Sequence, residues 1–416
     1  MNEHFDTLET RDPEQRERSQ LALLRVQLAY AKANTAAYAR LLSGVDPEAV
    51  TSRAALARLP VVRKSELLEL QKASRPFGGF AASGWGKQGR RAALVFASPG
   101  PIYEPEGDTP DYWRLARALF AAGFRPGDLV HNCFSYHLAP GGAMLESGAR
   151  ALGCTVFRGG TGQTELQVQA IAELGPDGYV GTPSFLKIVL DKADEQGIAL
   201  PTLKKALVSG EAFPPSLRDA VGKRGIAAYQ VYATADVGMV AYESRAHEGL
   251  IVDEGVLVEI VRPGTGDAVP AGEVGEVVVT TLANADYPLV RFGTGDLSAV
   301  LAGVSPCGRS NMRIKGWMGR ADQTTKVKGM FVHPSQVADI VRRHPEIVRA
   351  RLVVDSAAGA DRMTLHVEVP DNRSTSAEAI IASIREITKL RGEISFHAPG
   401  ELANDGKVID DTRSYQ

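Results

Sequence analysis

Short apolar runs alternate with amphipathic segments between residues 92 and 232, and this alternation limits the possible folds more than any other feature of the chain. The apolar runs predict strands at 93–96, 129–132, 155–157, 178–180 and 206–208. The amphipathic segments predict helices at 111–122, 164–174, 184–196 and 215–224. Strands that alternate with helices in this way usually form a mostly parallel sheet with helices on its faces. We therefore expect an α/β fold.

The chain has 416 residues, which is more than one hydrophobic core usually organises, so we expect at least two domains. Asp12 followed by Pro13 predicts the start of an N-terminal helix that runs to about Leu42. Residues 250–300 are rich in Val, Gly and Pro and predict a β-rich subdomain. These segments indicate one large N-terminal domain.

The C-terminal part follows a different pattern from the rest of the chain. Before it, the β-rich subdomain is expected to contain strands at 256–261 and 276–281. The segment 303–319 carries Pro, Gly, Ser and Asn, which is typical of a connector. After residue 322, two strand–helix units fit a small α+β domain of roughly 95 residues, an ordinary domain size.

Composition excludes several classes of protein. The formal net charge is −2 and the charges are interleaved, so we expect no nucleic-acid or membrane partner. The acidic, polar start of the chain does not resemble a signal peptide, and three cysteines indicate a reducing cytoplasm. The Walker A, nucleophile-elbow and HExxH motifs are absent from the sequence, as is a cysteine pair at zinc spacing.

Six short motifs carry the strongest information on function. They are LPVVRKSEL at 59–67, GTPS at 181–184, SGE at 209–211, YATADVG at 232–238, PLVRFGTGDL at 288–297 and DGKVID at 405–410. GRAD at 319–322, with KGMFVHPS at 328–335, adds the pattern of a hinge and the first strand of a small domain. In this order the motifs resemble the phenylacetate–CoA ligase family of adenylate-forming enzymes, from about Leu59 to Arg413.

The resemblance implies an ATP-dependent, AMP-forming acid–thiol ligase. Such an enzyme activates an aryl or other small organic acid as an acyl-adenylate and then transfers the acyl group to CoA. It uses ATP, Mg²⁺ and coenzyme A, and relatives suggest a homodimer. The resemblance also implies an AMP-binding domain over 1–319, a mobile C-terminal domain over 323–416 and a hinge near Asp322, which lets two half-reactions use different domain orientations.

Three residues take the central roles that the resemblance implies. Asp296 would accept hydrogen bonds from the ribose hydroxyls, although a turn aspartate is the alternative. Asp236 stands where the family has the glutamate that holds Mg²⁺, and its alternative is a solvent-facing loop acid. Lys407 matches the catalytic lysine that stabilises charge on the α-phosphate, whereas most isolated surface lysines are merely solvated.

Further residues are candidates for binding the nucleotide and the acid. The resemblance assigns nucleotide binding to Gly210, Glu211, Tyr232, Thr234 and Arg320. Tyr232 would stack on adenine, but a core tyrosine is nearly as good an explanation. The family's hydroxyl residue before the acid is alanine here, and Thr234 one step earlier is a possible substitute. The predicted substrate pocket consists of His131, Tyr136 and Gly141. The alternative role of Tyr136 is packing in the core.

The phosphate-binding loop departs from the family pattern, which is Ser-Ser-Gly-Thr-Thr-Gly-x-Pro. The chain has SPGPIYEP at 98–105, in which Gly100 and Pro105 keep their places. The segment 99–104 brings two prolines without an N–H, loses hydroxyl residues and a glycine, and adds the acid Glu104. Two hypotheses follow. The chain is a ligase with a tolerant loop, or it is a degenerate homologue that no longer uses ATP and binds or transfers a CoA thioester or an adenylate.

Some relatives carry a Cys/His cluster of metal-ligand type in the β-rich region. The corresponding stretches here, 243–250 and 305–308, keep only His247 and Cys307. Two such ligands are too few for the usual four-ligand zinc site, so we expect no zinc.

Overall fold

A computed structural model describes residues 3–84, 91–98, 101–321, 325–327, 330–357, 360–370, 376–403, 405 and 407–413. The chain divides into two compact units. Unit 1 comprises Met1–Val258, Val279–Phe292 and Leu301–Gly316, and unit 2 comprises Glu259–Val278, Gly293–Val300 and Trp317–Gln416. The last run of unit 2 begins close to the predicted domain boundary at 319, whereas two earlier β-rich segments also group with it. The predicted hinge residue Asp322 lies outside the described residues.

The N-terminal part of unit 1 is helical. Its elements are η1 (Thr7–Thr10), α1 (Pro13–Asn34), α2 (Ala36–Leu41), η2 (Pro47–Ala49), α3 (Arg53–Leu56) and α4 (Lys64–Ala73). Asp12 caps α1 as predicted, because its side chain accepts a hydrogen bond from the Gln15 N–H. The predicted single helix to Leu42 is two helices, since Thr35 has an extended backbone and caps α2.

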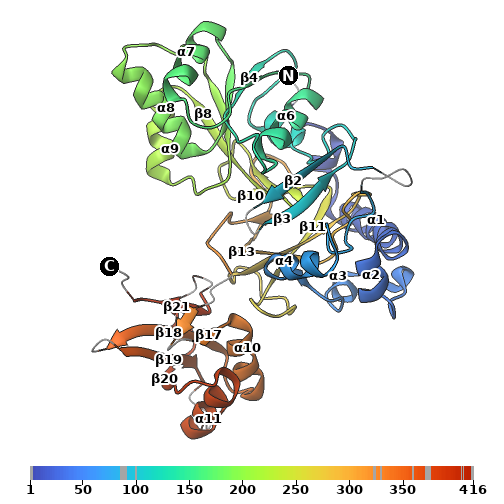
Figure 1. The fold of residues 1–416 in the computed structure, drawn as a ribbon, viewed down its shortest axis with the longest axis vertical. Helices are drawn as coiled ribbons and strands as arrows, with labels where there is room; N and C mark the ends of the chain where they lie inside the picture. The colour runs from blue at the N-terminus through green and yellow to red at the C-terminus, as the bar shows by residue number, and fades with distance from the viewer. Residues whose placement is uncertain are drawn as a thin grey trace. The chain divides into compact units, whose positions relative to one another are not determined.

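A nine-stranded sheet forms the centre of unit 1 (Figure 1). Its strands are, in spatial order, β14 (Val300–Leu301), β15 (Arg313–Ile314), β10 (Leu250–Val252), β9 (Gly238–Glu243), β8 (Ala227–Thr234), β7 (Lys205–Val208), β6 (Gly178–Gly181), β4 (Leu129–Asn132) and β5 (Thr155–Arg158). The strands from β5 to β8 pair in parallel, as predicted. The pairs β8–β9, β9–β10 and β10–β15 are antiparallel, so the sheet is mixed. The predicted connector 303–319 thus contributes a strand.

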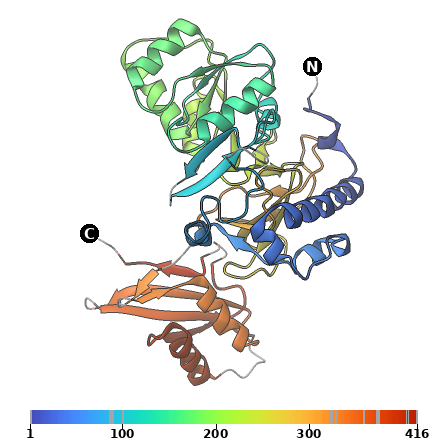
Figure 2. The same cartoon turned by 45° about the vertical axis from the view of Figure 1, so that its right-hand side comes forward.

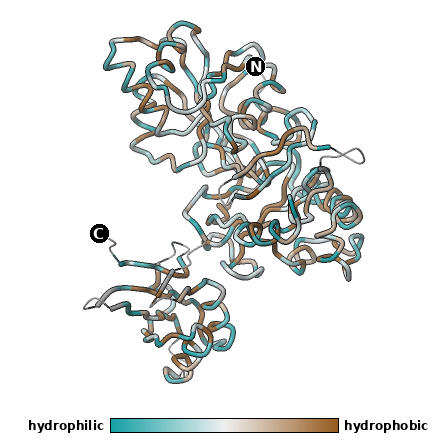
Figure 3. Tube along the Cα trace, in the orientation of Figure 1, coloured by the Kyte–Doolittle hydropathy of each residue, from teal (hydrophilic) through white to brown (hydrophobic). Residues whose placement is uncertain are grey.

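Helices cover both faces of the parallel strands. On one face α5 (Ala116–Ala121) and α6 (Gly141–Ala151) share a core with Val130, and on the other α8 (Pro183–Glu195) and α9 (Pro215–Gly222) share a core with Tyr179. Helix α7 (Thr164–Leu174) packs beside α8 (Figure 2). Figure 3 shows that hydrophobic and hydrophilic segments alternate along the trace. The predicted helix 111–122 begins only at Ala116, because Asp111 and Arg114 have positive φ.

The predicted strand at 93–96 does not join the parallel sheet. Strand β2 (Leu94–Ser98) instead pairs antiparallel with β3 (Ile102–Glu106) in a two-stranded hairpin (Figures 1 and 2). The register sets Phe96 opposite Glu104 and Ser98 opposite Ile102. Ser98 and residues 102–105 of the altered phosphate loop therefore belong to the two paired strands, and Pro99 and Gly100 lie outside the described residues.

A second sheet has the order β1 (Val62–Arg63), β13 (Phe292–Ser298), β12 (Gly275–Thr281) and β11 (Val256–Val261). Strands β11 and β12 confirm the strands predicted at 256–261 and 276–281, with one extra residue at the start of β12. The boundary between the two units runs through these strands.

The C-terminal part of unit 2 is an α+β fold, as predicted. Its elements are β16 (Thr325–Val327), β17 (Met330–Val332), α10 (Pro334–Arg343), β18 (Arg349–Ala357), β19 (Ala360–Glu368), α11 (Ala377–Thr388), β20 (Glu393–His397) and β21 (Ile409–Asp411). Four of these strands form a sheet in the order β20-β19-β18-β21, which shares a core with α10 and α11. Within the described part of the chain, no helix is long and apolar enough to cross a bilayer.

Candidate active site

The turn between β8 and β9 holds the predicted magnesium ligand. Asp236 is only 1% exposed there. Thr234 closes the turn, because its hydroxyl oxygen accepts a hydrogen bond from the Val237 N–H at 3.2 Å. Tyr232 is also buried and lies at an irregularity in the β8–β9 pairing. The structure thus places Tyr232, Thr234 and Asp236 at the carboxyl end of β8, the side where open α/β sheets usually bind ligands.

Lys64, the first residue of α4, forms an ion pair with Asp236. The Lys64 ammonium group donates to Asp236 Oδ2 at 2.5 Å, although the two residues are 172 positions apart in sequence. Asp236 Oδ1 is buried and has no hydrogen-bond partner among the described residues. A buried polar atom of this kind needs a ligand or water to complete it. One protein carboxylate, with phosphate oxygens and water as the other ligands, is a usual arrangement for Mg²⁺, so the site fits that ion.

Glu104 lies inside the protein instead of facing a bound nucleotide. Its residue exposure is 0%. Its carboxyl group accepts a hydrogen bond from the Ser98 N–H at 3.2 Å and bonds to the Ser98 hydroxyl. Burial, and next the nearby Asp236 carboxylate, raise the pKa of Glu104 to about 8. The hairpin therefore adds a second buried acid beside the candidate magnesium ligand.

Aromatic and glycine residues gather beside the carboxyl ends of β4, β6 and β7. A β-carbon at Gly141 would lie 3.4 Å from the Phe134 ring, and one at Gly210 would lie 3.7 Å from the same ring. A β-carbon at Gly142 would clash with Tyr136 at 2.8 Å, so α6 approaches Tyr136 more closely than an alanine permits. The structure therefore brings Gly210 and the predicted pocket residues Tyr136 and Gly141 around Phe134. Phe134 itself was not predicted, although an aromatic residue two positions after β4 is a usable signal.

The other pocket candidate, His131, has different neighbours. Its ring is fully buried, stacks on Phe157 with a centroid distance of 5.0 Å, and hydrogen-bonds Gln167 at 2.7 Å. Burial lowers the pKa of His131. These contacts are those of a histidine buried in the core on β4, so a role of His131 in substrate binding stays a prediction.

Tyr136 belongs to a polar network that includes Glu146 of α6. Its hydroxyl donates to Glu146 at 3.1 Å and accepts from the Asn132 amide at 2.9 Å. Arg158 also binds Glu146, with two contacts of 2.6 Å, and lowers the pKa of that carboxyl. The network fixes the Tyr136 ring through both of its neighbours, which is a property of preorganised binding sites.

Glu211, a predicted nucleotide-binding residue, lies at the start of α8. Its carboxylate accepts a hydrogen bond from the Ser184 N–H at 2.7 Å, where an acid also interacts favourably with the helix dipole. Gly210 before it has a φ of +85°, a conformation that favours glycine. The SGE motif thus brings the Glu211 carboxylate to the N-terminus of α8.

Unit 2 holds the predicted ribose ligand Asp296 on β13. Asp296 Oδ1 accepts hydrogen bonds from Arg320 at 3.0 Å and from the Trp317 indole N–H at 3.1 Å. A β-carbon at Gly295 would lie 2.8 Å from the Arg320 guanidinium, so glycine permits this approach. The structure brings the two predicted nucleotide-binding residues Asp296 and Arg320 together, and it adds Trp317, which lies in the predicted connector.

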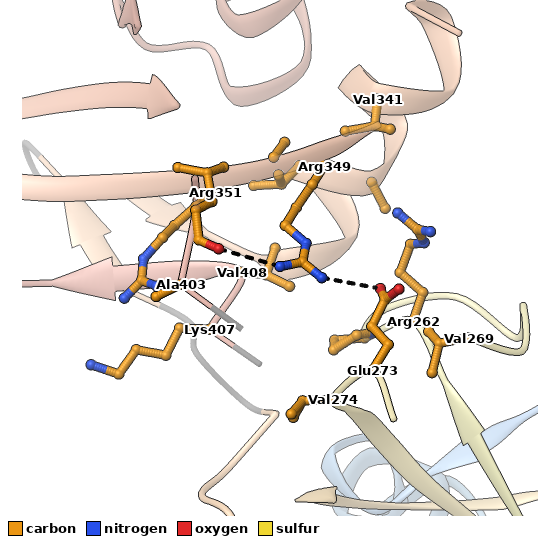
Figure 4. A pocket seen from close by; sticks show the side chains of 15 residues that line it. Arg262, Val269, Glu273, Val274, Val341, Arg349, Arg351, Ala403, Lys407 and Val408 are labelled. Carbon is orange, nitrogen blue, oxygen red and sulfur yellow. Dashed lines mark hydrogen bonds and ion pairs between the residues drawn. The ribbon is translucent and has the colours of Figure 1, made fainter. Parts of the chain in front are cut away.

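Lys407 lies between two pockets of unit 2. Its ammonium group donates to Asp410 at 2.8 Å and remains about half exposed. It lines one pocket together with Arg320. It also lines a second pocket, shown in Figure 4. In that second pocket Arg349 lies between the Leu402 carbonyl at 3.3 Å and Glu273 at 4.0 Å. The predicted catalytic lysine is therefore accessible from the pocket that Arg320 also lines.

The two remaining ligands of the altered Cys/His region lie in ordinary contacts. The His247 ring stacks on Tyr229 at 5.1 Å, and the Cys307 sulfur lies 3.1 Å from the Ser305 hydroxyl. Among the described residues, no group of three or more His, Cys, Asp or Glu side chains is placed to hold a metal ion. The absence of zinc stays a prediction.

Comparison with known proteins identifies the class to which this fold and site belong. Residues 112–285 match the family model for AMP-binding enzymes. The structure of 2-hydroxyisobutyryl-CoA ligase in the postadenylation state superposes with a TM-score of 0.72 and 24% identity, over 99% of this chain and 92% of that chain, which shows a shared fold.

Two relatives identify the family within that class. The phenylacetate-coenzyme A ligase of Aromatoleum evansii is 33% identical over 84% of this chain and 81% of its own length. The phenylacetate-coenzyme A ligase of Thermus thermophilus is 32% identical over 88% of this chain and 84% of its own length. The chain belongs to the phenylacetate–CoA ligase family.

Proposed function

We propose that the chain is an ATP-dependent, AMP-forming ligase that joins an aryl or other small organic acid to CoA. The observation that carries the proposal is the buried Asp236 carboxylate, of which one oxygen is held by Lys64 and the other has no partner among the described residues. A fixed, incompletely bonded acid at the carboxyl end of a sheet strand is suited to hold Mg²⁺. Family membership supports the reaction class.

In the first half-reaction, a carboxylate oxygen of the acid attacks the α-phosphorus of ATP and pyrophosphate leaves. Mg²⁺, when bound, neutralises charge on the phosphates. Asp236 would hold that ion together with phosphate oxygens, and Asp296 would accept hydrogen bonds from the ribose hydroxyls. Lys407 would stabilise charge that develops on the α-phosphate. Glu211, Tyr232, Thr234 and Arg320 are proposed to bind the rest of the nucleotide.

In the second half-reaction, the CoA thiol attacks the carbonyl carbon of the acyl-adenylate. The bond between that carbon and the AMP oxygen breaks, AMP leaves, and the thiol proton passes to solvent. The predicted hinge near Asp322 would turn Lys407 away at this stage, because its task ends when pyrophosphate has left.

The surroundings of Phe134 and Tyr136 support an aromatic acid as substrate. Aromatic rings attract one another in edge-to-face and offset arrangements, beyond the effect of buried area. Gly141 and Gly210 lie against the Phe134 ring without side chains of their own, so one edge of this ring meets only backbone there. Two further proposals are those of the family: a homodimer and a cytoplasmic location.

A second candidate function is that of a homologue that has lost adenylation and binds or transfers an adenylate or a CoA thioester. The burial of Glu104 at the altered phosphate loop favours it.

An ATP–pyrophosphate exchange assay over a panel of aryl acids separates the two candidates. Exchange with any acid supports the ligase, and the Asp219→Asn variant, which changes an exposed acid on α9, should retain it. If exchange is absent for every acid while AMP still binds, the second candidate is favoured. If neither exchange nor AMP binding is detected, both are wrong.

The role of Lys407 can be tested on each half-reaction separately. Lys407→Ala should reduce acyl-adenylate formation by about 100-fold or more, the usual effect of losing one charged group that stabilises a transition state. Thioester formation from a supplied acyl-adenylate should remain within about threefold, because no pyrophosphate leaves in that step. Equal loss in both steps would show that Lys407 supports the fold of unit 2 and not adenylation.

A further inference from the structure

Glu104 makes the contacts inside the protein that a bound phosphate makes in a phosphate loop. Phosphate loops bind anions through backbone N–H groups and hydroxyl groups. The hairpin offers both kinds of donor at Ser98, and the Glu104 carboxyl group takes both: the Ser98 N–H at 3.2 Å and the Ser98 hydroxyl. Both residues are buried, with exposures of 5% for Ser98 and 0% for Glu104. The backbone and hydroxyl donors of Ser98 are therefore already taken by a side chain of the chain itself.

Gln71 of α4 holds the hairpin in this closed arrangement. Its side-chain amide donates to the Tyr103 carbonyl at 2.9 Å, and its side-chain oxygen accepts from the Tyr103 N–H at 2.9 Å. Gln71 is fully buried, so these two bonds are protected from water. Helix α4 also begins with Lys64, which holds Asp236. One helix thus fixes both the hairpin and the candidate magnesium ligand.

The charges around Glu104 also disfavour an additional anion. Glu104 and Asp236 are two buried acids close enough to interact, and Lys64 is the cation that acts on both. A protonated Glu104 occupies the Ser98 donors, and an ionised Glu104 occupies them and repels phosphate as well. In either state a β- or γ-phosphate must displace the Glu104 carboxyl group before it can use this loop. An adenosine monophosphate ester has no β- or γ-phosphate, so it can bind without displacing the Glu104 carboxyl group.

We propose that Glu104 substitutes for the terminal phosphates of a nucleotide and makes this site select adenosine monophosphate esters over ATP. The inference rests on the proposed function, because it assumes that the site binds adenylates. It identifies Glu104 as a specificity-determining residue for the phosphate chain of the ligand. It also makes the ATP-dependent half-reaction of this chain slow, since binding of the pyrophosphate part of ATP is what Glu104 opposes.

The test measures the dissociation constants of AMP, ATP and inorganic pyrophosphate by calorimetry for the full chain and three variants. Glu104→Ala frees both Ser98 donors, and Glu104→Gln keeps the shape but cannot ionise. Glu106→Gln is the matched control, since Glu106 lies on the same strand and binds the Trp113 indole N–H at 2.8 Å. Thermal melting of each variant confirms that it is folded.

The wild-type chain should bind AMP at least about tenfold more tightly than ATP, which corresponds to one or two hydrogen bonds. Glu104→Ala should strengthen the binding of ATP and pyrophosphate by about tenfold or more and leave AMP within about twofold. Glu104→Gln should show a smaller change in the same direction, and Glu106→Gln no change.

Three results would overturn the inference. In the first, ATP binds the wild-type chain as tightly as AMP. In the second, neither Glu104 variant changes the affinity for ATP or pyrophosphate, and since Glu104→Gln preserves the volume of the side chain, this result stands even if Glu104→Ala does not fold. In the third, the folded wild-type chain binds no AMP, which overturns the proposed function together with the inference. Only the third result concerns the adenylate site itself.

Discussion

The β8–β9 turn and the β2–β3 hairpin each contribute one buried acid to the same part of unit 1, but the two acids differ in how completely they are bonded. Asp236 in the turn has one oxygen on Lys64 and one buried oxygen without a partner among the described residues. Glu104 in the hairpin uses both of its oxygens on Ser98. Both regions contain sequence motifs that are predicted to bind the nucleotide.

The bonding of these two carboxyl groups distinguishes a retained ligand site from an altered one. A buried polar atom that is left without a partner costs free energy, so it persists where a ligand completes it. A polar atom whose partners lie within the protein needs no ligand. By this criterion the turn retains a place for a ligand, whereas the hairpin has become part of the protein's own structure. The predictions below test that distinction.

The largest effect is expected for Asp236→Asn. The amide preserves the shape of the side chain and can still accept a hydrogen bond from Lys64, but it loses the charge that Mg²⁺ requires. Adenylation measured by pyrophosphate exchange should fall by about 100-fold or more, with a stability close to that of the wild type. If Asp236→Asn retains full exchange activity, the incompletely bonded oxygen is not a ligand site and the distinction fails.

A pH-dependent effect on stability is expected from Glu104. Its pKa is about 8 in the folded protein, against an ordinary value of 4.5 in the unfolded chain. Between these values the folded protein holds a proton that the unfolded chain has released, so the free energy of unfolding decreases as the pH rises. Glu104→Gln removes this dependence. In urea unfolding at pH 5 and pH 8, the stability advantage of Glu104→Gln over wild type should be larger at pH 8. Parallel pH curves for the two proteins would contradict the buried position of Glu104.

An intermediate effect is expected for Gln71→Ala, which removes both side-chain bonds to Tyr103. Two backbone groups lose their partners, so the free energy of unfolding should fall by about 2–3 kcal/mol. Gln169→Ala is the control, because Gln169 is exposed and its side-chain amide donates to Glu173 in the same helix; its effect should stay within about 0.5 kcal/mol. Equal stability of the two variants would show that Gln71 does not hold the hairpin.

The parallel half of the sheet could be predicted from the sequence because each strand lies next to the helix that follows it in the chain. Strand β4 matches the predicted bounds 129–132, and α7 matches 164–174. The antiparallel half was harder, since β15 pairs with β10 across more than sixty positions and consists of Arg313 and Ile314, too few residues to show a period. The hairpin was missed for a different reason: its prolines argued for a loop and gave no signal of strand pairing.

The residues of the candidate site could be located by motif, but their bonding could not. The motifs identify Asp236 and Asp296, which the structure has in the turn after β8 and within β13. No local pattern connects Lys64 with Asp236, because their contact exists only once two distant segments have packed. The same holds for the hydrogen bond that Trp317 donates to Asp296. It also holds for Glu104, because the sequence shows its charge but not that its side chain is buried against Ser98.

The smallest effect is expected for Thr234, and it tests whether a second residue of the β8–β9 turn binds the nucleotide. The Thr234 hydroxyl oxygen accepts from the Val237 N–H, which leaves its own O–H available as a donor. Thr234→Val removes both functions and should lower the free energy of unfolding by about 1 kcal/mol, whereas Thr234→Ser should restore it. If the O–H also donates to the nucleotide, AMP affinity falls by about fivefold to tenfold in Thr234→Val and recovers in Thr234→Ser. If AMP affinity is unchanged in both variants, Thr234 only closes the turn. The incompletely bonded group of this region is then Asp236 alone, and the hydroxyl that the family places before the acid has no substitute in this chain.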